Sequence, residues 1–401
     1  MIVLALNGGS STLKFRIEDC GGEAARGLGS GAIESLGPEA SLILRAAGAP
    51  ERMERASVPD LEAAVDRVAG WIAASLPGGV AAVEAVGHRV VHGGARFTRT
   101  TRIDSSVEKA VEDLASVAPL HNAPGLAGIR AARRHFPARP MVAVFDTAFH
   151  ATLPDAAATY AIPFDLARAH GIRRYGFHGL SYMNLVQRLP IVSDLRGAVQ
   201  RIVAFHLGSG CSAAAILGGR SVETSMGFSP LEGLVMGTRA GDLDPAIPLH
   251  LMGAAGLARA DVERILQHES GLAGLSGTDG DARAVLAAAA RGEARSRLAL
   301  DVFVHRARKY LGAYLAVLGG ADAVTFSGGI GERSPEIRAA ILEGMDWCGV
   351  RIDPALNARV RGGEARVSPE GASPEVWVIG ADEERVIARE TARCLGITSS
   401  G

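Results

Sequence analysis

The stretch "IVLALNGGSSTLKFRI" at residues 2–17 decides the fold, because it joins two apolar runs through one small polar turn. The turn contains an asparagine, two glycines, two serines and a threonine, and the chain leaves it through Lys14. Asn-Gly between apolar runs is a strong signal for a β-hairpin. Glycines also let a backbone approach phosphate, and hydroxyls donate hydrogen bonds to it. The stretch therefore predicts a hairpin and leaves open whether its turn is structural or binds phosphate.

A second stretch, "IVAFHLGSGCSAAAIL" at residues 202–217, repeats this plan of strand, Gly/Ser-rich turn and strand. The repetition predicts two related domains, each offering a small-residue hairpin to a common cleft. A third turn lies in "AVTFSGGIGERSPEIRAAILE" at residues 323–343, where glycines lead from a strand into a helix. Ser334 and Pro335 fit the cap and the first turn of that helix.

Other short apolar runs, such as "MVAVF" (141–145) and "VWVI" (376–379), are typical of buried strands. Apolar residues at three- and four-residue steps over 296–318 predict an amphipathic helix. Strands that alternate with helices predict an α/β architecture.

Composition narrows the class of protein. A chain of 401 residues with 48% hydrophobic and 21% charged residues is expected to be soluble and to form two or more domains. A net charge of −1 favours neither a nucleic-acid partner nor a polybasic membrane surface. Its four cysteines form no CxxC pair, which fits reduced thiols in the cytoplasm, and no run reaches the roughly 18 apolar residues of a membrane span.

The common nucleotide-binding motifs do not account for the three glycine-rich turns. GxxxxGK[ST] does not occur, and the third turn reads G-G-I-G rather than G-x-G-x-x-G. The protein-kinase motifs are missing as well. With these motifs excluded, the remaining interpretation is that the hairpin turns of two domains bind phosphate between them.

Candidate chemical groups lie in seven polar segments with apolar or glycine-rich surroundings. Each has an ordinary explanation: Asp146 can be a turn residue, Arg89 a salt-bridge partner, and His178 a packing residue. Arg239 can pair with a carboxylate, and Glu383 can stabilise a helix N-terminus. Their combination indicates an active site. The segments are "GHRVVHGG" (87–94), "PLHNAPG" (119–125), "AVFDTAFH" (143–150), "RRYGFHG" (173–179), "MGTRAGDLDP" (236–245), "GTDGDAR" (277–283) and "ADEERVIA" (381–388).

This combination resembles the acetokinase family of the sugar-kinase/actin/chaperone-ATPase superfamily. The resemblance covers nearly the whole chain, in the order "LNGGSSTLKF", "GHRVVHGG", "FDTAFH", "RRYGFHG", "SMGFSPLEGLVMGTRAGDLDP", "FSGGIGERS" and "DEERVIARET". It implies an α/β fold of duplicated ribonuclease-H-like (actin-like ATPase) domains with an interdomain cleft. The N-terminal acetokinase domain would comprise residues 1–149 plus 386–401, and the C-terminal nucleotide-binding domain residues 150–385.

The same resemblance implies a cytoplasmic, homodimeric enzyme. It would transfer the γ-phosphoryl group of ATP reversibly and in line to acetate, giving acetyl phosphate and ADP. Mg²⁺, with Mn²⁺ as an alternative, would assist this transfer. The resemblance implies neither a nucleic-acid nor a membrane partner.

Roles for individual residues follow from the resemblance. It implies a catalytic carboxylate and two transition-state stabilisers, namely Asp146, His178 and Arg239. The acetate carboxylate would be held by Arg89, and the methyl group would enter a pocket lined by Val91, Leu120, Phe177 and Pro230. The metal would be bound by Asn7 and Glu383. The nucleotide would contact Ser10, Ser11, Thr12, Lys14, His206, Leu207, Gly208, Ser209, Gly210, Asp281, Ala282, Arg283, Gly329, Ile330, Gly331, Glu332 and Arg333.

The implied chemistry is physically reasonable. Acetate is already an anion at neutral pH, because simple carboxylic acids have a pKa of about 4. It needs no general base, and the obstacle is repulsion between the acetate and the charged phosphoryl group. Positioning and positive charge should therefore dominate catalysis. We expect Asp146 to organise metal, water or arginine rather than to accept a proton.

Four segments depart from the family pattern. "HLGSG" has Ser209 where an asparagine is usual, and "GLSY" has Leu180 and Tyr182 where G-T-S-H is usual. The segment before Asp281 is more acidic than usual, and Arg333 replaces an asparagine. Serine has one hydroxyl donor where an asparagine amide has two, so the preference for the phosphoryl donor is open.

Three alternatives remain. The first is a propionate or other short-chain fatty acid kinase of the same family. An apolar pocket separates two acids that differ by one methylene group by only about 1–3 kcal/mol in binding selectivity. A non-catalytic actin-like switch would bind nucleotide without the constellation of Arg89, His178 and Arg239. A sugar kinase would need a base for a neutral hydroxyl group, and the apolar pocket argues against it.

Overall fold

The computed structural model describes residues 1–9, 11–22, 25–114, 119–193, 195 and 200–397. The chain divides into two compact units. Unit 1 consists of Met1–Phe149 together with Asp382–Gly401, and unit 2 of His150–Ala381. Serine 10, an expected phosphate ligand, lies outside the described residues.

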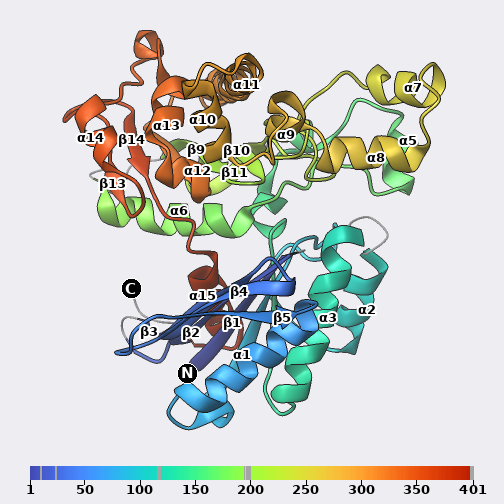
Figure 1. The fold of residues 1–401 in the computed structure, drawn as a ribbon, viewed down its shortest axis with the longest axis vertical. Coiled ribbons are helices and arrows are strands. Elements are labelled where there is room, and N and C mark those ends of the chain that lie inside the picture. The colour runs from blue at the N-terminus through green and yellow to red at the C-terminus, as the bar shows by residue number, and fades with distance from the viewer. Residues whose placement is uncertain (10, 23–24, 115–118, 194, 196–199, 398–401) are drawn as a thin grey trace. The chain divides into compact units, whose positions relative to one another are not determined.

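Unit 1 contains a sheet that the described residues build from eight strands in the order β5-β4-β3-β2-β1-β6-β8-β7 (Figure 1). β1 and β2 pair antiparallel, which confirms the predicted hairpin. Asn7 and Gly8 were expected in the turn, but they pair with Lys14 and Leu13 as the last residues of β1. β1, β6 and β8 run parallel to one another. The strands are β1 (Ile2–Gly8), β2 (Thr12–Asp19), β3 (Arg26–Glu34), β4 (Gly37–Ala46), β5 (Arg52–Val58), β6 (Ala85–Val90), β7 (Thr101–Arg102) and β8 (Met141–Phe145).

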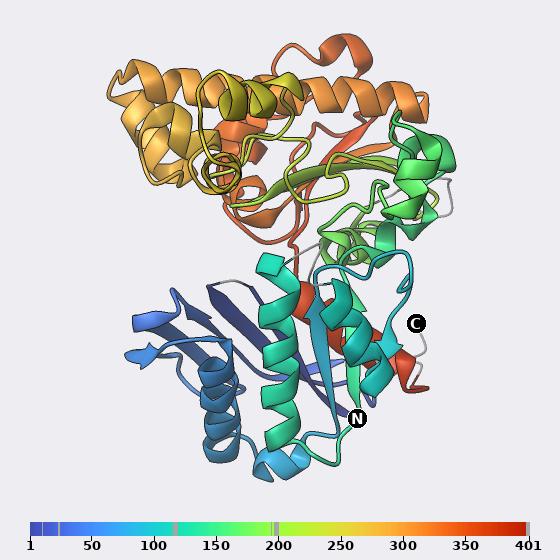
Figure 2. The ribbon, with the colours of Figure 1, turned by 90° about the vertical axis from the view of Figure 1, so that its right-hand side faces the viewer.

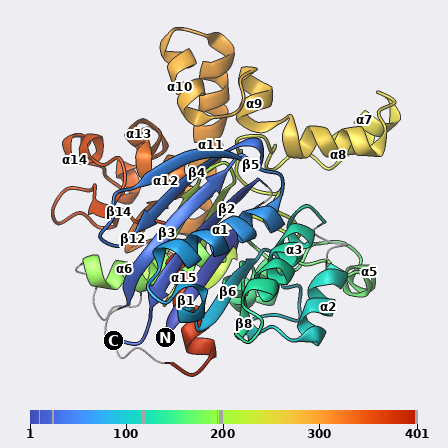
Figure 3. The same ribbon diagram turned by 60° about the horizontal axis from the view of Figure 1, so that its bottom comes forward.

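Helices cover both faces of this sheet (Figures 2 and 3). α1 (Leu61–Ser75) and α3 (Pro119–His135) lie on one face and α15 (Glu383–Cys394) on the other, while α2 (Ser105–Asp113) packs against α3. A Cβ atom at Gly87 of β6 would lie 2.1 Å from Oγ1 of Thr391 in α15. Only a glycine therefore lets α15 pack so closely on the sheet. Short 3₁₀ turns occur at η1 (Gly79–Ala82) and η3 (Ala148–Thr152).

Unit 2 contains a sheet whose described strands follow the order β11-β10-β9-β12-β14-β13. β9 and β10 pair antiparallel with His206 opposite Ser212, so the second predicted hairpin is confirmed. β12 runs parallel to both β9 and β14. The strands are β9 (Arg201–Leu207), β10 (Cys211–Leu217), β11 (Arg220–Thr224), β12 (Ala323–Ser327), β13 (Ala365–Arg366) and β14 (Glu375–Val378).

In unit 2, α6 (Gly179–Val192) and α11 (Ala294–Leu318) lie on opposite sides of the sheet (Figure 1). α11 matches the helix expected over 296–318. The third glycine-rich turn folds as the short helix α12 (Gly328–Arg333), and Ser334 caps α13 (Pro335–Leu342) as expected. The other helices are α4 (Asp155–Ala158), α5 (Phe164–Ala169), α7 (Ala246–Gly253), α8 (Arg259–His268), α9 (Gly271–Ser276), α10 (Ala282–Ala290), η4 (Asp346–Cys348) and α14 (Pro354–Arg359).

The two sheets share one core topology, which confirms the predicted duplication of a ribonuclease-H-like α/β fold. In unit 1 the shared strands are β3-β2-β1-β6-β8, and in unit 2 they are β11-β10-β9-β12-β14. Each set is an antiparallel meander of three strands followed by two parallel strands. Among the helices described here, none is long and apolar enough to cross a membrane.

Candidate active site

Three of the expected site residues of unit 1 lie at one edge of its sheet. Asn7 is near the end of β1, Arg89 near the end of β6, and Asp146 directly after β8. Because these strands are parallel, their carboxyl ends meet at the same edge, where α/β sheets commonly bind ligands. The backbone N–H of Asp146 donates to the carbonyl of Val90, which fixes the two strand ends together at 3.0 Å.

Arg89 forms a buried ion pair with Asp146. Its Nε donates to Oδ2 of Asp146 at 2.9 Å, and its Nη2 donates to the same oxygen. Asp146 is fully buried, and 17% of the Arg89 side chain is exposed. Burial disfavours the charged guanidinium, but the carboxylates of Asp146 and Glu383 outweigh it and raise the pKa of Arg89 above its ordinary value. Arg89 is therefore a permanent, positioned cation.

Asn7 links this ion pair to the first turn of α15. Its Oδ1 accepts from Nη1 of Arg89 at 3.3 Å. Its Nδ2 donates to Oε2 of Glu383 at 2.9 Å and to Oε1 of Glu384 at 2.7 Å. Burial and the neighbouring charge of Glu383 raise the pKa of Glu384. The carboxylates of Glu383 and Glu384 thus lie beside one amide group. Burial and mutual repulsion disfavour the negative charge of Glu384 there.

The donor set at Asn7 fits a hard divalent cation. Carboxylate and amide oxygens are the ligands that Mg²⁺ prefers, and Mg²⁺ usually takes few protein ligands besides water and phosphate. Oδ1 of Asn7 faces Arg89 and Nδ2 faces the two carboxylates, so that binding of a cation by Oδ1 would require the amide to turn and would give up the hydrogen bond to Arg89. Among the residues that the structure describes, no cluster of three or more His, Cys, Asp or Glu side chains could hold a metal by itself.

The first hairpin turn presents its side chains at the same edge. Lys14 is exposed on β2 opposite Asn7, and its charge offsets part of the rise that burial and Glu383 cause in the pKa of Glu384. Ser11 is exposed in the turn, and the N–H of Gly9 donates to the carbonyl of Thr12 at 2.8 Å. The turn is closed by its own backbone, which leaves the lysine amine and the hydroxyl of Ser11 accessible.

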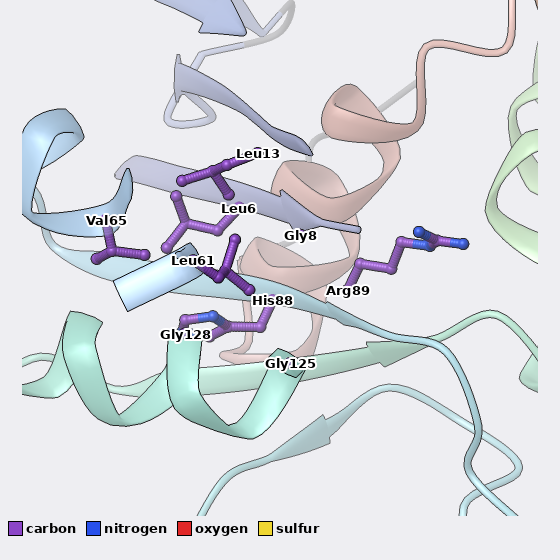
Figure 4. A pocket seen from close by; sticks show the side chains of 9 residues that line it. All are labelled: Leu6, Gly8, Leu13, Leu61, Val65, His88, Arg89, Gly125 and Gly128. Atoms are coloured by element: carbon purple, nitrogen blue, oxygen red, sulfur yellow. The ribbon is translucent and has the colours of Figure 1, made fainter. Parts of the chain in front are cut away.

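A small cavity lies between the sheet and the helices α1 and α3, and its lining includes Gly8 and Arg89. Its lining also includes Leu6, Leu61, Val65 and His88 (Figure 4). The Arg89 side chain extends away from this apolar lining in Figure 4, because neighbouring residues of a strand point to opposite faces. Burial lowers the pKa of His88 to about 3, so this histidine is neutral. The cavity is a packing feature of the core.

In unit 2 the glycine-rich segments converge. A Cβ atom at Gly208 would lie 3.9 Å from the amide nitrogen of Gly329, which places the turn after β9 beside the turn after β12. The N–H of Gly237 donates to the carbonyl of Ser209 at 2.9 Å. A Cβ atom at Gly280 would lie 2.4 Å from the carbonyl oxygen of Gly237. Four segments that are far apart in the sequence therefore share one backbone-lined surface, of the type that phosphate favours.

His178 and Arg239 both reach this surface. A Cβ atom at Gly210 would lie 3.3 Å from Nε2 of His178 and 3.6 Å from Nη1 of Arg239. The ring of His178 stacks on that of His206 at 4.1 Å between centroids. Arg239 also donates to the carbonyl of Pro230 at 3.0 Å. The structure thus brings the two expected transition-state stabilisers to the second hairpin turn.

His150 supports the backbone next to His178. Its ring nitrogens contact Oγ of Ser221 at 2.8 Å and the carbonyl of Phe177 at 3.0 Å. Burial lowers the pKa of His150 to about 4, so the imidazole is neutral at physiological pH. A neutral ring can donate from Nε2 to the Phe177 carbonyl while it accepts from Ser221 at Nδ1.

The expected nucleoside-binding residues occupy two local structures. Asp281 caps α10, and the guanidinium of the exposed Arg283 folds back onto its carboxylate, which lowers the pKa of Asp281. Residues 329–333 form most of α12, in which Oε1 of Glu332 accepts from the N–H groups of Gly328 and Ala381. The carboxylate of Glu332 therefore joins the first residue of α12 to Ala381 by hydrogen bonds to their backbone N–H groups.

The expected methyl-binding residues belong to different units. Val91 is nearly buried in unit 1, and Phe177 is buried in unit 2 with Pro230 half-buried. The side chain of Leu120 lies outside the described part of the chain. The methyl-binding pocket stays a prediction.

The structure adds residues that the sequence analysis did not assign. Glu384 shares Asn7 with Glu383, and its position directly after Glu383 was an available signal. Ser212 contacts Nδ1 of His178 at 2.8 Å, and Ser181 contacts Nδ1 of His206 at 2.8 Å. Nothing in the local pattern distinguishes these serines, because their roles depend on the pairing of β9 with β10 and on the packing of α6.

Comparisons with known proteins agree with this arrangement. The model of the Acetokinase family matches residues 2–389. The chain is 46% identical to the acetate kinase of Chloroherpeton thalassium and 43% identical to that of Methanosarcina thermophila, and each alignment covers 98% of this chain, with 99% and 96% of the relative.

Solved structures give the same result. The acetate kinase of Porphyromonas gingivalis matches with a TM-score of 0.89 and 36% identity, and a propionate kinase of Francisella tularensis with 0.90 and 33%. Each comparison covers 98% of this chain and 99% of the other. With this much of its length matched, the chain belongs to the acetokinase family.

Proposed function

We propose that this protein is an acetate kinase, which transfers the γ-phosphoryl group of ATP reversibly to acetate and so forms acetyl phosphate and ADP. The observation that carries the proposal is the convergence of His178 and Arg239 on the glycine turn at Gly210. Phosphoryl transfer is catalysed mainly by positioning and by positive charge around the transferring group. The guanidinium supplies positive charge, and the imidazole beside the same turn supplies a positioned hydrogen-bond donor.

Arg89 is proposed to bind the acetate carboxylate. A guanidinium carries five N–H donors, and the hydrogen bonds to Asp146 and Asn7 use three of them. A planar fork of donors matches a carboxylate, which can accept two parallel hydrogen bonds. Asp146 would then fix the plane in which acetate is held.

Asp146 is proposed to organise Arg89 rather than to accept a proton. Acetate has a pKa of about 4 and is an anion at neutral pH, so its attack on phosphorus releases no proton. The carboxylate of Asp146 accepts two hydrogen bonds from one guanidinium, which supports the organising role. Asn7, Glu383 and Glu384 would hold Mg²⁺, which when bound neutralises phosphate charge.

The nucleotide is proposed to bind mainly to unit 2. The turns at Gly208–Gly210 and Gly329–Arg333 would contact its phosphates and adenosine, with Asp281, Ala282 and Arg283 on the nucleoside side. Lys14, Ser11 and Thr12 would add contacts from unit 1. We propose that units 1 and 2 are the N-terminal acetokinase domain and the nucleotide-binding domain, respectively.

We also propose that the protein works as a homodimer in the cytoplasm. The family resemblance supports both the dimer and the compartment. The dimer is also supported by three apolar side chains of α7, namely Leu249, Ile247 and Met252, which are 67%, 46% and 37% exposed. Light scattering coupled to gel filtration should give twice the 41.5 kDa mass of one chain. A mass of one chain would contradict the dimer.

The experiment that tests the proposed reaction is trapping of the acyl phosphate with hydroxylamine. The protein is incubated with ATP, Mg²⁺ and acetate, propionate or butyrate in parallel, and the acyl hydroxamate is measured. We expect acetate to give the highest rate and propionate a lower one, since each methylene group changes selectivity by about 1–3 kcal/mol. GTP and pyrophosphate in place of ATP would reveal the effect of Ser209. No hydroxamate from any of the three acids would contradict the proposal.

A further inference from the structure

Two hydroxyl groups of unit 2 form a hydrogen-bonded chain that ends on His178. Oη of Tyr182 lies 2.6 Å from Oγ of Ser212, and Oγ of Ser212 lies 2.8 Å from Nδ1 of His178. Tyr182 and Ser212 are both fully buried. The chain approaches the imidazole on the side of Nδ1, whereas Nε2 faces the glycine turn at Gly210.

Tyr182 is also connected to His178 through the backbone. His178 caps α6 with φ 59° and ψ 25°, in the left-handed region that few residues other than glycine adopt. The N–H of Tyr182, one turn further along the helix, donates to the carbonyl of His178 at 3.2 Å. One residue therefore holds the strained main chain of His178 directly and its ring through Ser212.

The direction of the hydrogen bonds decides what His178 can do. A neutral imidazole carries one proton, and the nitrogen that bears it is set by the partner of the other nitrogen. If the Ser212 hydroxyl donates to Nδ1, the proton of His178 resides on Nε2. An N–H group at Nε2 would then point at the anionic phosphoryl group without a net charge on the ring.

We propose that Tyr182 is a positioning residue that acts through Ser212, its hydroxyl donating to Oγ of Ser212, which in turn donates to Nδ1 of His178. This inference rests on the proposed function, because it assigns His178 an Nε2–H donor for the phosphoryl group. Burial raises the pKa of the Tyr182 hydroxyl, so that it keeps its proton and remains a donor. The position is one where the acetokinase pattern usually has a histidine, and here the tyrosine supplies the support.

Two variants break the chain at different links. Tyr182→Phe removes one hydroxyl and keeps the ring, which packs edge-on against His150 at 5.6 Å. Ser212→Ala removes the middle link. We expect each variant to lower kcat about tenfold, as for the loss of one net hydrogen bond, while both KM values change less than about twofold. The double variant should lose no more than either single variant, because the two groups act as one unit.

Tyr314→Phe provides a matched control. Tyr314 is a buried tyrosine of α11 in the same unit, and its ring packs edge-on against Tyr310. The variant removes another buried hydroxyl of unit 2 and keeps both Tyr182 and Ser212, so that thermal stability is expected to fall while kcat is unchanged. An equal loss of kcat in Tyr314→Phe would show that the effect at Tyr182 is general destabilisation, and would overturn the proposal.

Nitrogen NMR of the histidine-labelled protein tests the tautomer without any substrate. We expect His178 to carry its proton on Nε2 in the wild type and to become a mixture of tautomers in Tyr182→Phe and Ser212→Ala. A wild-type proton on Nδ1, or variants with unchanged kcat and tautomer, would overturn the proposal. If the wild type formed no acyl phosphate, the proposed function would fail, and the tautomer would still decide whether the hydroxyl chain orients His178. If Tyr182→Phe does not fold, the tautomer of the wild type and the kcat and tautomer of Ser212→Ala still test the proposal.

Discussion

Arg89 donates from both Nε and Nη2 to a single oxygen of Asp146, so that the guanidinium is anchored along one edge. Its Nη1 meanwhile donates to Asn7, whose amide group contacts Glu383 and Glu384. One network thus joins the ends of three parallel strands to the start of α15. A change at any member should alter the orientation of Arg89.

The role of Asp146 can be tested with Asp146→Asn. The amide keeps the shape of the side chain but loses the charge that pairs with Arg89. We expect kcat/KM for acetate to fall about a hundredfold at every pH, because a misplacement of about 1 Å can cost this much. Steady-state rates across the pH range provide the measurement. The disappearance of one limb of the pH profile would identify a general base and contradict the organising role.

The opening hairpin is tested by Lys14→Ala. The exposed lysine lies opposite Asn7 on the turn that is expected to bind phosphate. We expect the KM for ATP to rise about tenfold or more and the KM for acetate to change little, since hydrogen bonds to charged groups contribute about 1.5–3 kcal/mol.

Lys109→Ala is the matched control for Lys14→Ala. Lys109 is also exposed, but its amine pairs with Glu112 and Asp113 on its own helix α2. This variant should leave both KM values unchanged. If Lys14→Ala altered only thermal stability, as a surface substitution does, the hairpin would be a structural feature.

The carboxylate at Glu384 should make stability depend on pH. Burial and Glu383 raise the pKa of Glu384, so its protonated form favours the folded state. This contribution is fully present below the ordinary carboxyl pKa of 4.5 and is lost as pH rises through the raised value. Glu384→Gln should therefore be more stable than the wild type near neutral pH without metal, with a difference that shrinks as pH falls. Urea unfolding at several pH values between about 5 and 8 measures it. A constant difference would contradict the assignment.

Close packing of α15 on the sheet predicts the effect of Gly87→Ala. The new Cβ would clash with Oγ1 of Thr391 and with Ile387, and we expect a loss of about 1–3 kcal/mol in the free energy of unfolding. A second change, Thr391→Ala, should recover part of this loss. Gly70→Ala in α1 is the control: its Cβ meets no atom within 4 Å, and it should add about 0.5–1 kcal/mol. Equal effects of Gly87→Ala and Gly70→Ala would contradict the packing.

Local sequence patterns predicted the elements that carry the site. Small polar residues between apolar runs marked both hairpins, because turn chemistry and apolar flanks lie within a few residues of each other. The exact turn was misplaced, since Asn7 and Gly8 pair within β1. Strands β3, β4 and β5 were not predicted. Residues 26–58 mix glycines and charges with apolar residues, and their strands alternate between buried and exposed positions rather than forming apolar runs.

Local sequence patterns could not predict hydrogen bonds between residues that are far apart in the chain. The pairing of Asn7 with Glu383 joins residues 376 positions apart, and the contact of Ser212 with His178 depends on how α6 packs on β10. The family resemblance named Arg89 and Asp146, but their hydrogen bonds follow from the parallel order of β6 and β8. Tyr182 stood out in the sequence as a departure, and the structure gives it a partner in Ser212.

The central claim is that an acetate oxygen becomes bonded to the γ-phosphorus of ATP and that ADP is released. Acetate labelled with oxygen-18 in both carboxylate positions, ATP and Mg²⁺ are incubated with the protein, and the product is cleaved with hydroxylamine. Hydroxylamine attacks the carbonyl carbon, so the released phosphate keeps the bridging oxygen that acetate contributed. Phosphorus NMR should show phosphate with one labelled oxygen, formed in equal amount with ADP. Unlabelled phosphate would indicate mere ATP hydrolysis, and AMP with pyrophosphate would indicate attack on the α-phosphorus; either result would contradict the account.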